Sequence, residues 1–310
     1  TCIRQACNRL SSIGCLLSRS EAPAHIPVSG GQSPARRAWG RLRRNPVAVA
    51  SAVVLLLLAA VAVIVPRIIT IDPYRQSLAD SLLPPGTAGH PLGTDHLGRD
   101  LLLRLIDGAR VSLAMGFIAV GIAVIVGGFI GLIAGYFGGM TDGVLMRLIE
   151  VQLTFPGILF ALVIVTILGS GLTKAMIAIG IASVPRFARV VRGSVLAARH
   201  ELYVEAAKSI GASDRRVMFV HIVPQVLGPV ITLATLGLAN AILAGAALSF
   251  LGLGPQPPTA EWGLMLADSR KYLQVAWWLG VFPGLAIMIA VLAINLLGDG
   301  VRDALDPRSE

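Results

Sequence analysis

The sequence predicts an all-α integral membrane protein. Of its 310 residues, 55% are hydrophobic and only 14% are charged, and its mean hydropathy is +0.76. A soluble globular domain averages about 25% charged residues. The missing charges are replaced by Ala, Val, Ile, Leu and 34 glycines, arranged in long apolar runs separated by basic connections. This composition excludes a disordered chain, a coiled coil and a fibre.

Six segments are long and apolar enough to be membrane-spanning helices. A hydrocarbon core of about 30 Å requires about 20 residues of α-helix. Five uncharged runs meet that length, at residues 47–65, 111–141, 151–173, 222–260 and 272–298. A sixth segment, 175–191, is interrupted by Arg186 and Arg189, whose side chains we expect to reach lipid headgroups rather than to sense voltage. Close helix packing is predicted at small-xxx-small faces formed by Gly127, Gly128, Gly131 and Gly135.

The distribution of Lys and Arg predicts the orientation of these six transmembrane helices. If the N-terminus lies inside, 18 of the 26 basic residues fall in inner segments and 8 in outer segments. Because positively charged loops stay on the cytoplasmic side, both termini are predicted to be cytoplasmic. The net charge of +9 is then explained by topology rather than by a nucleic-acid partner. We expect a multi-pass protein of the cell inner (plasma) membrane whose first helix is an anchor rather than a cleaved leader.

The spans divide the chain into four predicted parts. They are a cytoplasmic tail with a basic strip (1–46), the first helix with an outer segment (47–110), a five-helix core (111–298) and a cytoplasmic C-terminal tail (299–310). Cys2, Cys7 and Cys15 all lie in the first tail, and their spacing fits no zinc or iron–sulfur pattern. We expect them to be reduced cytoplasmic thiols.

The inner loop at residues 192–224 is the most informative connection. A loop of about thirty residues is usually functional or independently folded. Residues 201–210 are good helix formers. An apolar face is predicted from Tyr203, Ala207 and Ile210, because these residues recur at i, i+4 and i+7.

Glycine and proline punctuate the rest of this loop. Gly211 is expected to end the first helix, since glycine readily adopts the left-handed conformation of a helix C-terminus. Ser213 is expected to cap a second short helix over residues 214–222, and Pro224 to close it. The predicted helix–turn–helix projects into the cytoplasm and suits docking into a groove on a partner.

The same loop carries a recognisable motif. Residues 205–207 (Glu-Ala-Ala), followed by Gly211 and then by Val223 and Pro224, resemble the EAA loop of ABC-importer permeases. The chain departs from the general form at His221, where the family has Ile, and at Val223, where the family has Leu. His followed by Ile before this proline is similar to the peptide-transporter branch. The two differences therefore point to that branch within the family.

Two further segments resemble the C-type permease subunit of oligopeptide, dipeptide and nickel importers. Residues 93–100 (Gly-Thr-Asp-His-Leu-Gly-Arg-Asp) lie in the first outer segment, and residues 248–263 lie in the last one. The resemblance runs in order and spacing from about residue 41 to residue 307. Three motifs at consistent topological positions identify the family, whereas each motif alone is weak evidence.

The resemblance implies the fold of a type I ABC-importer permease and a mechanism of alternating access. It implies a homologous second permease subunit, two cytoplasmic ATPase subunits or domains, and an extracytoplasmic substrate-binding protein as partners. ATP and Mg²⁺ would be bound by the ATPase subunits, with no cofactor on this chain. The residues implied to couple the permease to the ATPase are Glu205, Ala206, Ala207, Gly211 and Pro224.

The outer segments hold a second set of candidate residues. Asp95, Arg99 and Asp100 are predicted to form a charge-assisted cluster at the outer mouth, either as a rigidifying cap or in contact with substrate. Three closely spaced prolines forbid a helix just before Glu261 and Trp262, so the chain there is expected to form a stiff irregular loop. We expect Trp262 at the membrane interface, and the loop either as a docking surface for a binding protein or as a cover for the pore.

Several catalytic patterns are missing from the sequence. Its only lysines are Lys174, Lys208 and Lys271, and none lies in a Gly-x-x-x-x-Gly-Lys-[Ser/Thr] phosphate cradle. No His-Glu-x-x-His motif or convincing set of Ser, His and acid occurs. His90 and His96 are near neighbours in an outer segment but fit no zinc spacing. We therefore expect neither an enzyme active site nor a metal site on this chain.

Peptide, as an oligo- or dipeptide, is the expected substrate. Nickel or glutathione is the alternative, because similar C-type subunits serve those substrates. An ion-driven secondary transporter is a rival from another class, but it would need internal repeats and carboxylates at the centres of spans, and the sequence shows neither. A membrane-embedded enzyme would need the catalytic set that is missing.

Overall fold

The computed structural model describes residues 34–68 and 72–305, which form helices joined by turns and irregular loops. The long helices are α3 (Pro46–Ile68), α4 (Leu101–Phe137), α7 (Leu172–Ala198), α10 (Val223–Phe250) and α12 (Trp278–Leu305). The shorter ones are α2 (Pro34–Arg44), α5 (Gly139–Leu153), α6 (Gly157–Leu168), α8 (Leu202–Ser209), α9 (Asp214–Arg216) and α11 (Trp262–Ser269). Cys2, Cys7 and Cys15, and the expectation that they are reduced thiols, lie outside the described residues.

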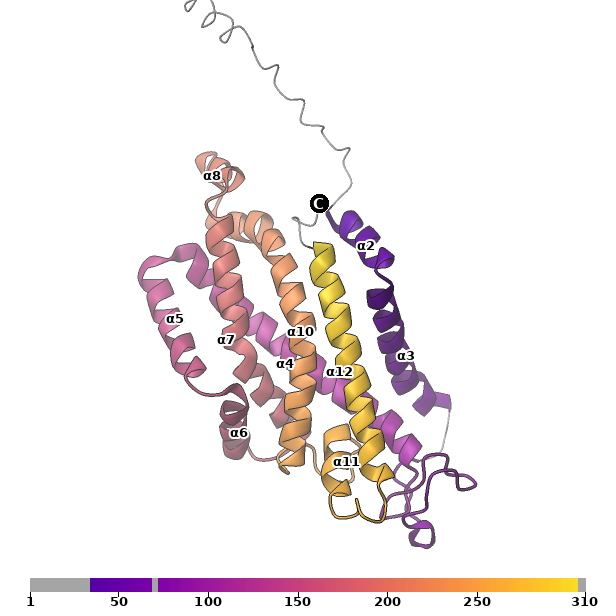
Figure 1. Ribbon diagram of the computed structural model, residues 1–310. Helices are drawn as coiled ribbons and strands as arrows, with labels where there is room; N and C mark the ends of the chain where they lie inside the picture. The colour runs from indigo at the N-terminus through magenta and orange to yellow at the C-terminus, as the bar shows by residue number, and fades with distance from the viewer. Residues whose placement is uncertain (1–33, 69–71, 306–310) are drawn as a thin grey trace, which may run out of the picture. The chain divides into compact units, whose positions relative to one another are not determined.

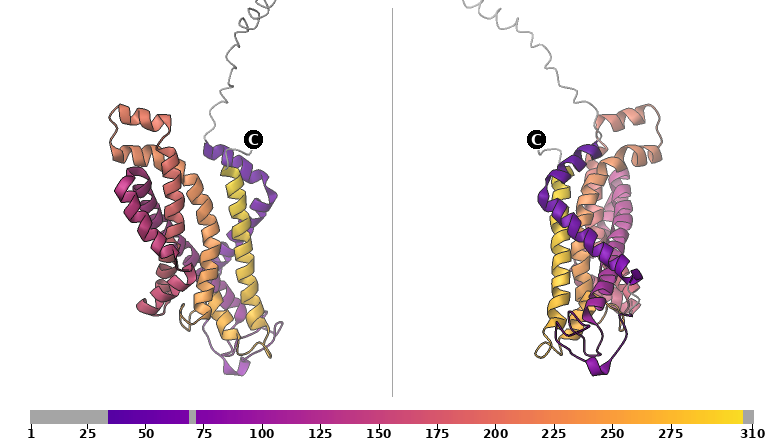
Figure 2. Two further views of the ribbon diagram at one scale, coloured as in Figure 1. Left: turned by 60° about the vertical axis from the view of Figure 1, so that its left-hand side comes forward. Right: turned by 90° about the vertical axis from the view of Figure 1, so that its right-hand side faces the viewer.

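The chain divides into two units, Thr1–Arg37 and Ala38–Glu310. Of the first unit only residues 34–37 are described, as the beginning of α2. Within the second unit, α7, α10 and α12 run side by side (Figures 1 and 2). Helix α8 and the C-terminal end of α12 lie at one end of this unit, and α11 and the segment 72–100 lie at the other. We call these the α8 end and the α11 end.

A helix occupies each of the six predicted spans. Among the described residues, four helices are long and apolar enough to cross a membrane, namely α3, α4, the continuous helix from Asp214 to Phe250, and α12. The pair α5 and α6, bent by 90°, adds a fifth if the pair is one span. Helix α7 is 27 residues long but carries Lys174 near its start and arginines in its second half. A count of six spans and the cytoplasmic position of the termini therefore stay predictions.

Two helices differ from the predicted runs. Helix α4 begins at Leu101 rather than near residue 111, because the carboxylate of Asp100 caps it by accepting a backbone N–H of its first turn at 3.0 Å. Helix α5 includes residues 142–150, which were predicted to be an inner connection, and extends into the predicted span on either side. Gly138 and Gly139 separate it from α4 with φ angles of +66° and +53°, which glycine adopts at little cost.

Helix α4 packs closely on α7 through residues that lack side chains. A Cβ atom on Gly131 would lie 2.4 Å from the carbonyl oxygen of Ala188, and one on Gly127 would lie 2.6 Å from that of Val184. The predicted small-residue face is thereby confirmed at these two positions. A Cβ on Gly128 would meet nothing within 4 Å, so that residue lies off the packed face.

Candidate coupling loop and outer polar network

Helix α8 ends as the sequence predicts. It spans Leu202–Ser209, and Gly211 follows with a φ of +82°. The backbone N–H groups of Gly211 and Ala212 donate to the carbonyl oxygens of Lys208 and Ala207, at 2.9 and 3.1 Å. These bonds satisfy carbonyl groups that a helix end would otherwise leave unpaired.

The predicted apolar face of α8 is correct at Ala207 and wrong at Tyr203 and Ile210. Val204 is fully buried and Ala207 is 7% exposed, whereas Ile210 is 86% exposed and Tyr203 is 39% exposed. The buried residues are therefore spaced at i and i+3, and Val204 belongs to a core cluster with residues of the following helix, including Val217. The register follows from the return of the chain after Gly211, which determines which side of α8 is covered.

Pro224 does not close the second helix, contrary to the prediction. The chain runs from α9 through one π-helical stretch, Val217–Ile222, directly into α10, with Pro224 in the first turn of α10. In a regular α-helix the proline ring collides with the carbonyl one turn earlier and lacks an N–H for the ladder. The wider π turn before Pro224 shifts the hydrogen-bond register, and this relieves both problems.

The segment 201–224, hereafter the coupling element, is attached to the α8-end terminus of α4. The hydroxyl of Tyr136 donates to Asp214 Oδ1 at 2.5 Å. The ammonium of Lys208 lies 5.0 Å from the centroid of the Tyr136 ring, a favourable cation–π distance. The sequence analysis did not identify Tyr136. The only feature that could have indicated it is a hydroxyl-bearing aromatic residue at the end of an apolar run.

Four of the five predicted coupling residues are exposed in this chain: Glu205, Ala206, Gly211 and Pro224. Ala207 is buried and packs inward. The exposed apolar side chains of Leu202, at 81%, and Ile210, at 86%, lie near them. Exposed apolar side chains therefore lie beside the exposed polar ones on this helix and turn.

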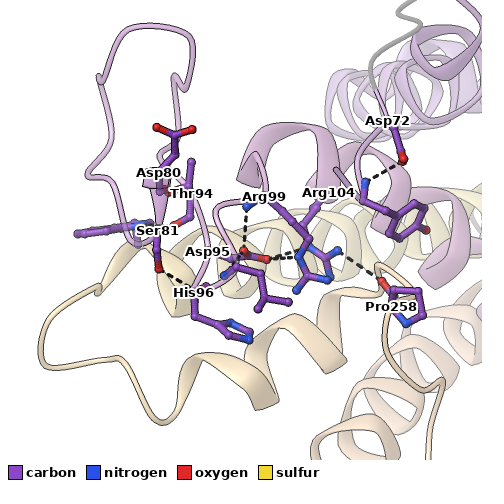
Figure 3. A network of polar contacts seen from close by, with 12 residues as sticks. Asp72, Asp80, Ser81, Thr94, Asp95, His96, Arg99, Arg104 and Pro258 are labelled. Carbon is purple, nitrogen blue, oxygen red and sulfur yellow. Dashed lines mark hydrogen bonds and ion pairs between the residues drawn. The ribbon is translucent and has the colours of Figure 1, made fainter. Parts of the chain in front are cut away.

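At the α11 end, Asp95 lies between two arginines (Figure 3). Its Oδ2 atom is 2.6 Å from Arg99 Nε and 3.5 Å from Arg104 Nε, and its Oδ1 accepts the backbone N–H groups of Leu97 and Arg99 at 2.9 and 3.0 Å. Asp95, Arg99 and Arg104 are 6%, 4% and 3% exposed. The structure thus pairs Asp95 with Arg99 as predicted. It also adds Arg104, which the sequence could have indicated only as a charged residue at the start of an apolar run.

Asp100 is not part of this cluster, contrary to the prediction. Besides capping α4, it lies 2.8 Å from His90 Nδ1 through its Oδ2 atom. The ring of His96 instead stacks on Tyr272 with centroids 5.1 Å apart, so the two histidines do not converge. Among the described residues, no group of three His, Cys, Asp or Glu side chains could hold a metal ion.

Glu261 and Trp262 are buried, at 2% and 1% exposed. The carboxylate of Glu261 caps α11 by accepting the N–H groups of Gly263 and Leu264 at 2.9 and 2.8 Å. The indole N–H of Trp262 donates to the carbonyl of Leu105 at 3.0 Å. The start of α4 covers the ring of Trp262, and in this conformation neither side chain is available to a partner.

Tyr74 joins the segment 72–100 to α4 at the same end. Its hydroxyl donates to Asp107 Oδ2 at 2.5 Å, and Arg104 lies 5.9 Å from its ring centroid. Burial, and then the hydrogen bond to Asp107, raise the pKa of the Tyr74 phenol above its usual value. The α11 end is thus a network of paired polar groups that fixes the segment 72–100 to α4.

Comparison with known families identifies the chain. Residues 127–310 match the family described as "Binding-protein-dependent transport system inner membrane component". Residues 33–85 match "N-terminal TM domain of oligopeptide transport permease C". Together the two matches include the first span, the part of the helical core from residue 127 onward and the coupling element.

Curated relatives cover almost the whole chain. The dipeptide transport system permease protein DppC of Alkalihalophilus pseudofirmus is 45% identical over 89% of this chain and 90% of its own length. The di/tripeptide transport system permease protein DppC of Pseudomonas aeruginosa is 45% identical over 93% of this chain and 96% of its own. The glutathione transport system permease protein GsiD of Pectobacterium atrosepticum is 42% identical over 92% and 96%.

A solved structure shares the fold. An inward-facing form of the MetNI methionine ABC transporter matches with a TM-score of 0.54 and 19% identity, over 66% of this chain and 98% of that chain. At this level of identity the likeness concerns the fold alone. The family match over more than half of the chain and the relatives above 40% identity show that this chain is a membrane protein of the binding-protein-dependent transport system inner membrane component family, the permeases of ABC importers.

Proposed function

We propose that this chain is the C-type permease subunit of an ATP-driven importer of short peptides in the cell inner membrane. It forms one half of the translocation pathway, and a homologous second permease subunit forms the other half. The observation that carries the proposal is the coupling element, which presents Glu205, Ala206 and Gly211 at the surface of a structured helix and turn. The chain provides the pathway, and ATP is hydrolysed elsewhere in the assembly.

The coupling element acts as a rigid lever between an ATPase and the membrane helices. Val204 and Val217 belong to the same core cluster as Val195 of α7 and Leu132 of α4. The second arm of the element continues into α10 without a break. A displacement imposed on α8 therefore reaches three long helices, as alternating access requires.

The partners follow from the family and from this surface. Two cytoplasmic ATPase subunits or domains, with ATP and Mg²⁺, receive the coupling elements of the two permease subunits. An extracytoplasmic binding protein delivers substrate at the α11 end, in keeping with the family's dependence on binding proteins. The buried pairing of Asp95 with Arg99 and Arg104 supports a rigid cap at that end rather than direct substrate contact.

Short peptides are the substrate class that the relatives favour. Two relatives are named for dipeptides or for di- and tripeptides, and a third is named for glutathione, which is itself a tripeptide. Glutathione is therefore the second candidate. A family defined by dependence on a binding protein favours this proposal over an ion-driven secondary transporter.

Reconstitution tests the proposal. The chain is expressed with its partner subunits, purified, and placed in proteoliposomes with ATP inside and the binding protein and a radiolabelled dipeptide outside. We expect uptake that requires both ATP and the binding protein, and its loss in the variant Glu205→Arg, with purification yield as the folding control. Uptake that persists without ATP, or that follows an ion gradient, would refute the proposal.

A further inference from the structure

Arg186 and Arg189 stand out in the middle of α7. Both side chains are exposed, and within residues 34–68 and 72–305 neither has an ion-pair or hydrogen-bond partner. Arg192, at the next i+3 position, differs. Its guanidinium binds Asp142 of α5 through two hydrogen bonds of 2.5 and 2.6 Å.

The predicted span at residues 175–191 includes both arginines. Measured along α7 from Lys174, near the helix start, Arg186 lies about 18 Å and Arg189 about 22 Å away, at 1.5 Å per residue. The hydrocarbon core is about 30 Å thick. With Lys174 at the outer headgroups, the Cα atoms of both arginines lie inside that core, and that of Arg186 lies close to its middle.

The two arginines share a face of α7 that this chain leaves uncovered. Val184 and Ala188 pack with residues of α4 and α5, and Phe187 packs with residues of α4 and α10. Residues 186 and 189 lie on the opposite side of the helix, at 100° per residue. In Figure 1, α7 is flanked by α5 and α10, and α4 lies behind it, so the open side of α7 faces away from α4.

Lipid is an unfavourable environment for this face. A guanidinium at mid-membrane depth is costly in hydrocarbon, and such residues face a helix-bundle interior or a water-filled cavity. The adjoining helix α5 also exposes charges, Arg147 and Glu150, which lie 3.6 Å from each other. Two neighbouring helices, α5 and α7, thus both present exposed charged groups.

We propose that Arg186 and Arg189 line the aqueous pathway and bind the terminal carboxylate of the peptide in transit. This inference rests on the proposed function. A guanidinium holds a carboxylate through two parallel hydrogen bonds, and two arginines at i and i+3 point to neighbouring positions on one helix face. Every linear peptide carries a free α-carboxylate whatever its side chains are, so this contact suits a carrier of varied short peptides.

Uptake by the assembled importer tests the chemistry of the site. Proteoliposomes receive alanyl-alanine or its C-terminal amide, each at saturating binding protein. We expect the double variant R186Q/R189Q to lower uptake of the free acid roughly tenfold, as loss of a charge-assisted contact implies, and to leave the slower uptake of the amide unchanged. R186K should retain most of the activity, and Lys174→Gln, at the end of the same helix, is the matched control.

Three other outcomes overturn the proposal. Equal losses for the acid and the amide would assign the arginines to helix packing or coupling. No loss for either peptide would mean that the arginines reach lipid headgroups. Absence of uptake by the unmutated importer would refute the proposed function itself, and the carboxylate site with it.

Thiol labelling tests the aqueous environment independently of transport rate. In a chain whose Cys2, Cys7 and Cys15 are replaced by Ser, Arg189→Cys should react with a charged methanethiosulfonate reagent, and alanyl-alanine should slow the reaction. Leu56→Cys is the matched control, because Leu56 lies in the middle of α3, is 68% exposed and has only apolar neighbours along that helix. Equal protection of position 189 and position 56 from the reagent would contradict a water-lined face.

Discussion

The Tyr136 hydroxyl donates a 2.5 Å hydrogen bond to Asp214, and this contact joins the end of α4 to the start of the helix that carries the coupling element into α10. The two residues are far apart in the sequence but both lie at the α8 end. Because α4 also packs closely on α7 at Gly127 and Gly131, the contact links the lever to this helix pair.

Tyr136→Phe should loosen the coupling element without unfolding the helices. Loss of this hydrogen bond removes about 1 kcal/mol from the local stability of the element, or roughly fivefold in its opening equilibrium. Amide hydrogen exchange of residues 202–222 in the purified importer should accelerate by that factor. Tyr272→Phe, at the α11 end, is the control and should leave this exchange unchanged. Unaltered amide exchange in Tyr136→Phe would show that the Tyr136 hydroxyl does not stabilise the coupling element.

Gly211→Ala should destabilise the turn of the coupling element because its φ is +82°. A left-handed conformation costs an alanine about 1–2 kcal/mol relative to glycine. Gly143→Ala, in helix α5, is the matched control, since neither position has an atom within 4 Å of the added Cβ. The first variant should lower the ratio of peptide transported to ATP hydrolysed, and the second should not. An equal ratio of peptide transported to ATP hydrolysed in both variants would show that the turn geometry at Gly211 is not needed for coupling.

Gly131→Ala should separate α4 from α7. The added methyl would lie 2.4 Å from a backbone carbonyl oxygen, which moves only with its helix. Overpacking of this kind costs about 1–3 kcal/mol. We expect a lower thermal unfolding temperature for the detergent-solubilised importer, and no decrease for Gly128→Ala, whose Cβ meets nothing within 4 Å. Equal melting temperatures would contradict the close packing of these two helices.

Asp95→Asn should destabilise the α11 end strongly. The substitution leaves Arg99 and Arg104 buried without a carboxylate, and breaking a buried ion pair in this way costs about 3–5 kcal/mol. Arg147→Gln breaks an exposed pair at 3.6 Å and should cost about 0.5 kcal/mol or less. Thermal unfolding and protease sensitivity of residues 72–100 measure both effects. Similar stability of the two variants would show that the Asp95 network does not hold the outer segment.

The sequence predicted what local chemistry determines. Apolar runs located a helix at each of the six segments, and Gly211 ended α8 where a left-handed residue was needed. Pairing of Asp95 with Arg99 was also within reach, since the two residues are four apart. Each of these features depends on residues that are close together in the chain.

Tertiary contacts decided the features that were predicted wrongly. Burial of Val204 rather than Ile210 depends on which side of α8 the returning chain covers, and hydrophobic periodicity does not specify that side. The burial of Trp262 was not predicted, because the α4 residues that enclose its ring lie far away in the sequence. Pro224 continues a helix because a π turn precedes it, and residue propensities gave no sign of that turn.

Site-specific crosslinking from the exposed tip of the coupling element tests the central claim most directly. A photoreactive amino acid replaces Ile210, which is 86% exposed, in the importer assembled in membranes, and Val204, which is fully buried, provides the matched control position. The account predicts a crosslink from position 210 to an ATP-hydrolysing subunit, altered by ATP, and none from position 204. Crosslinks from position 210 to lipid or to no protein would contradict it.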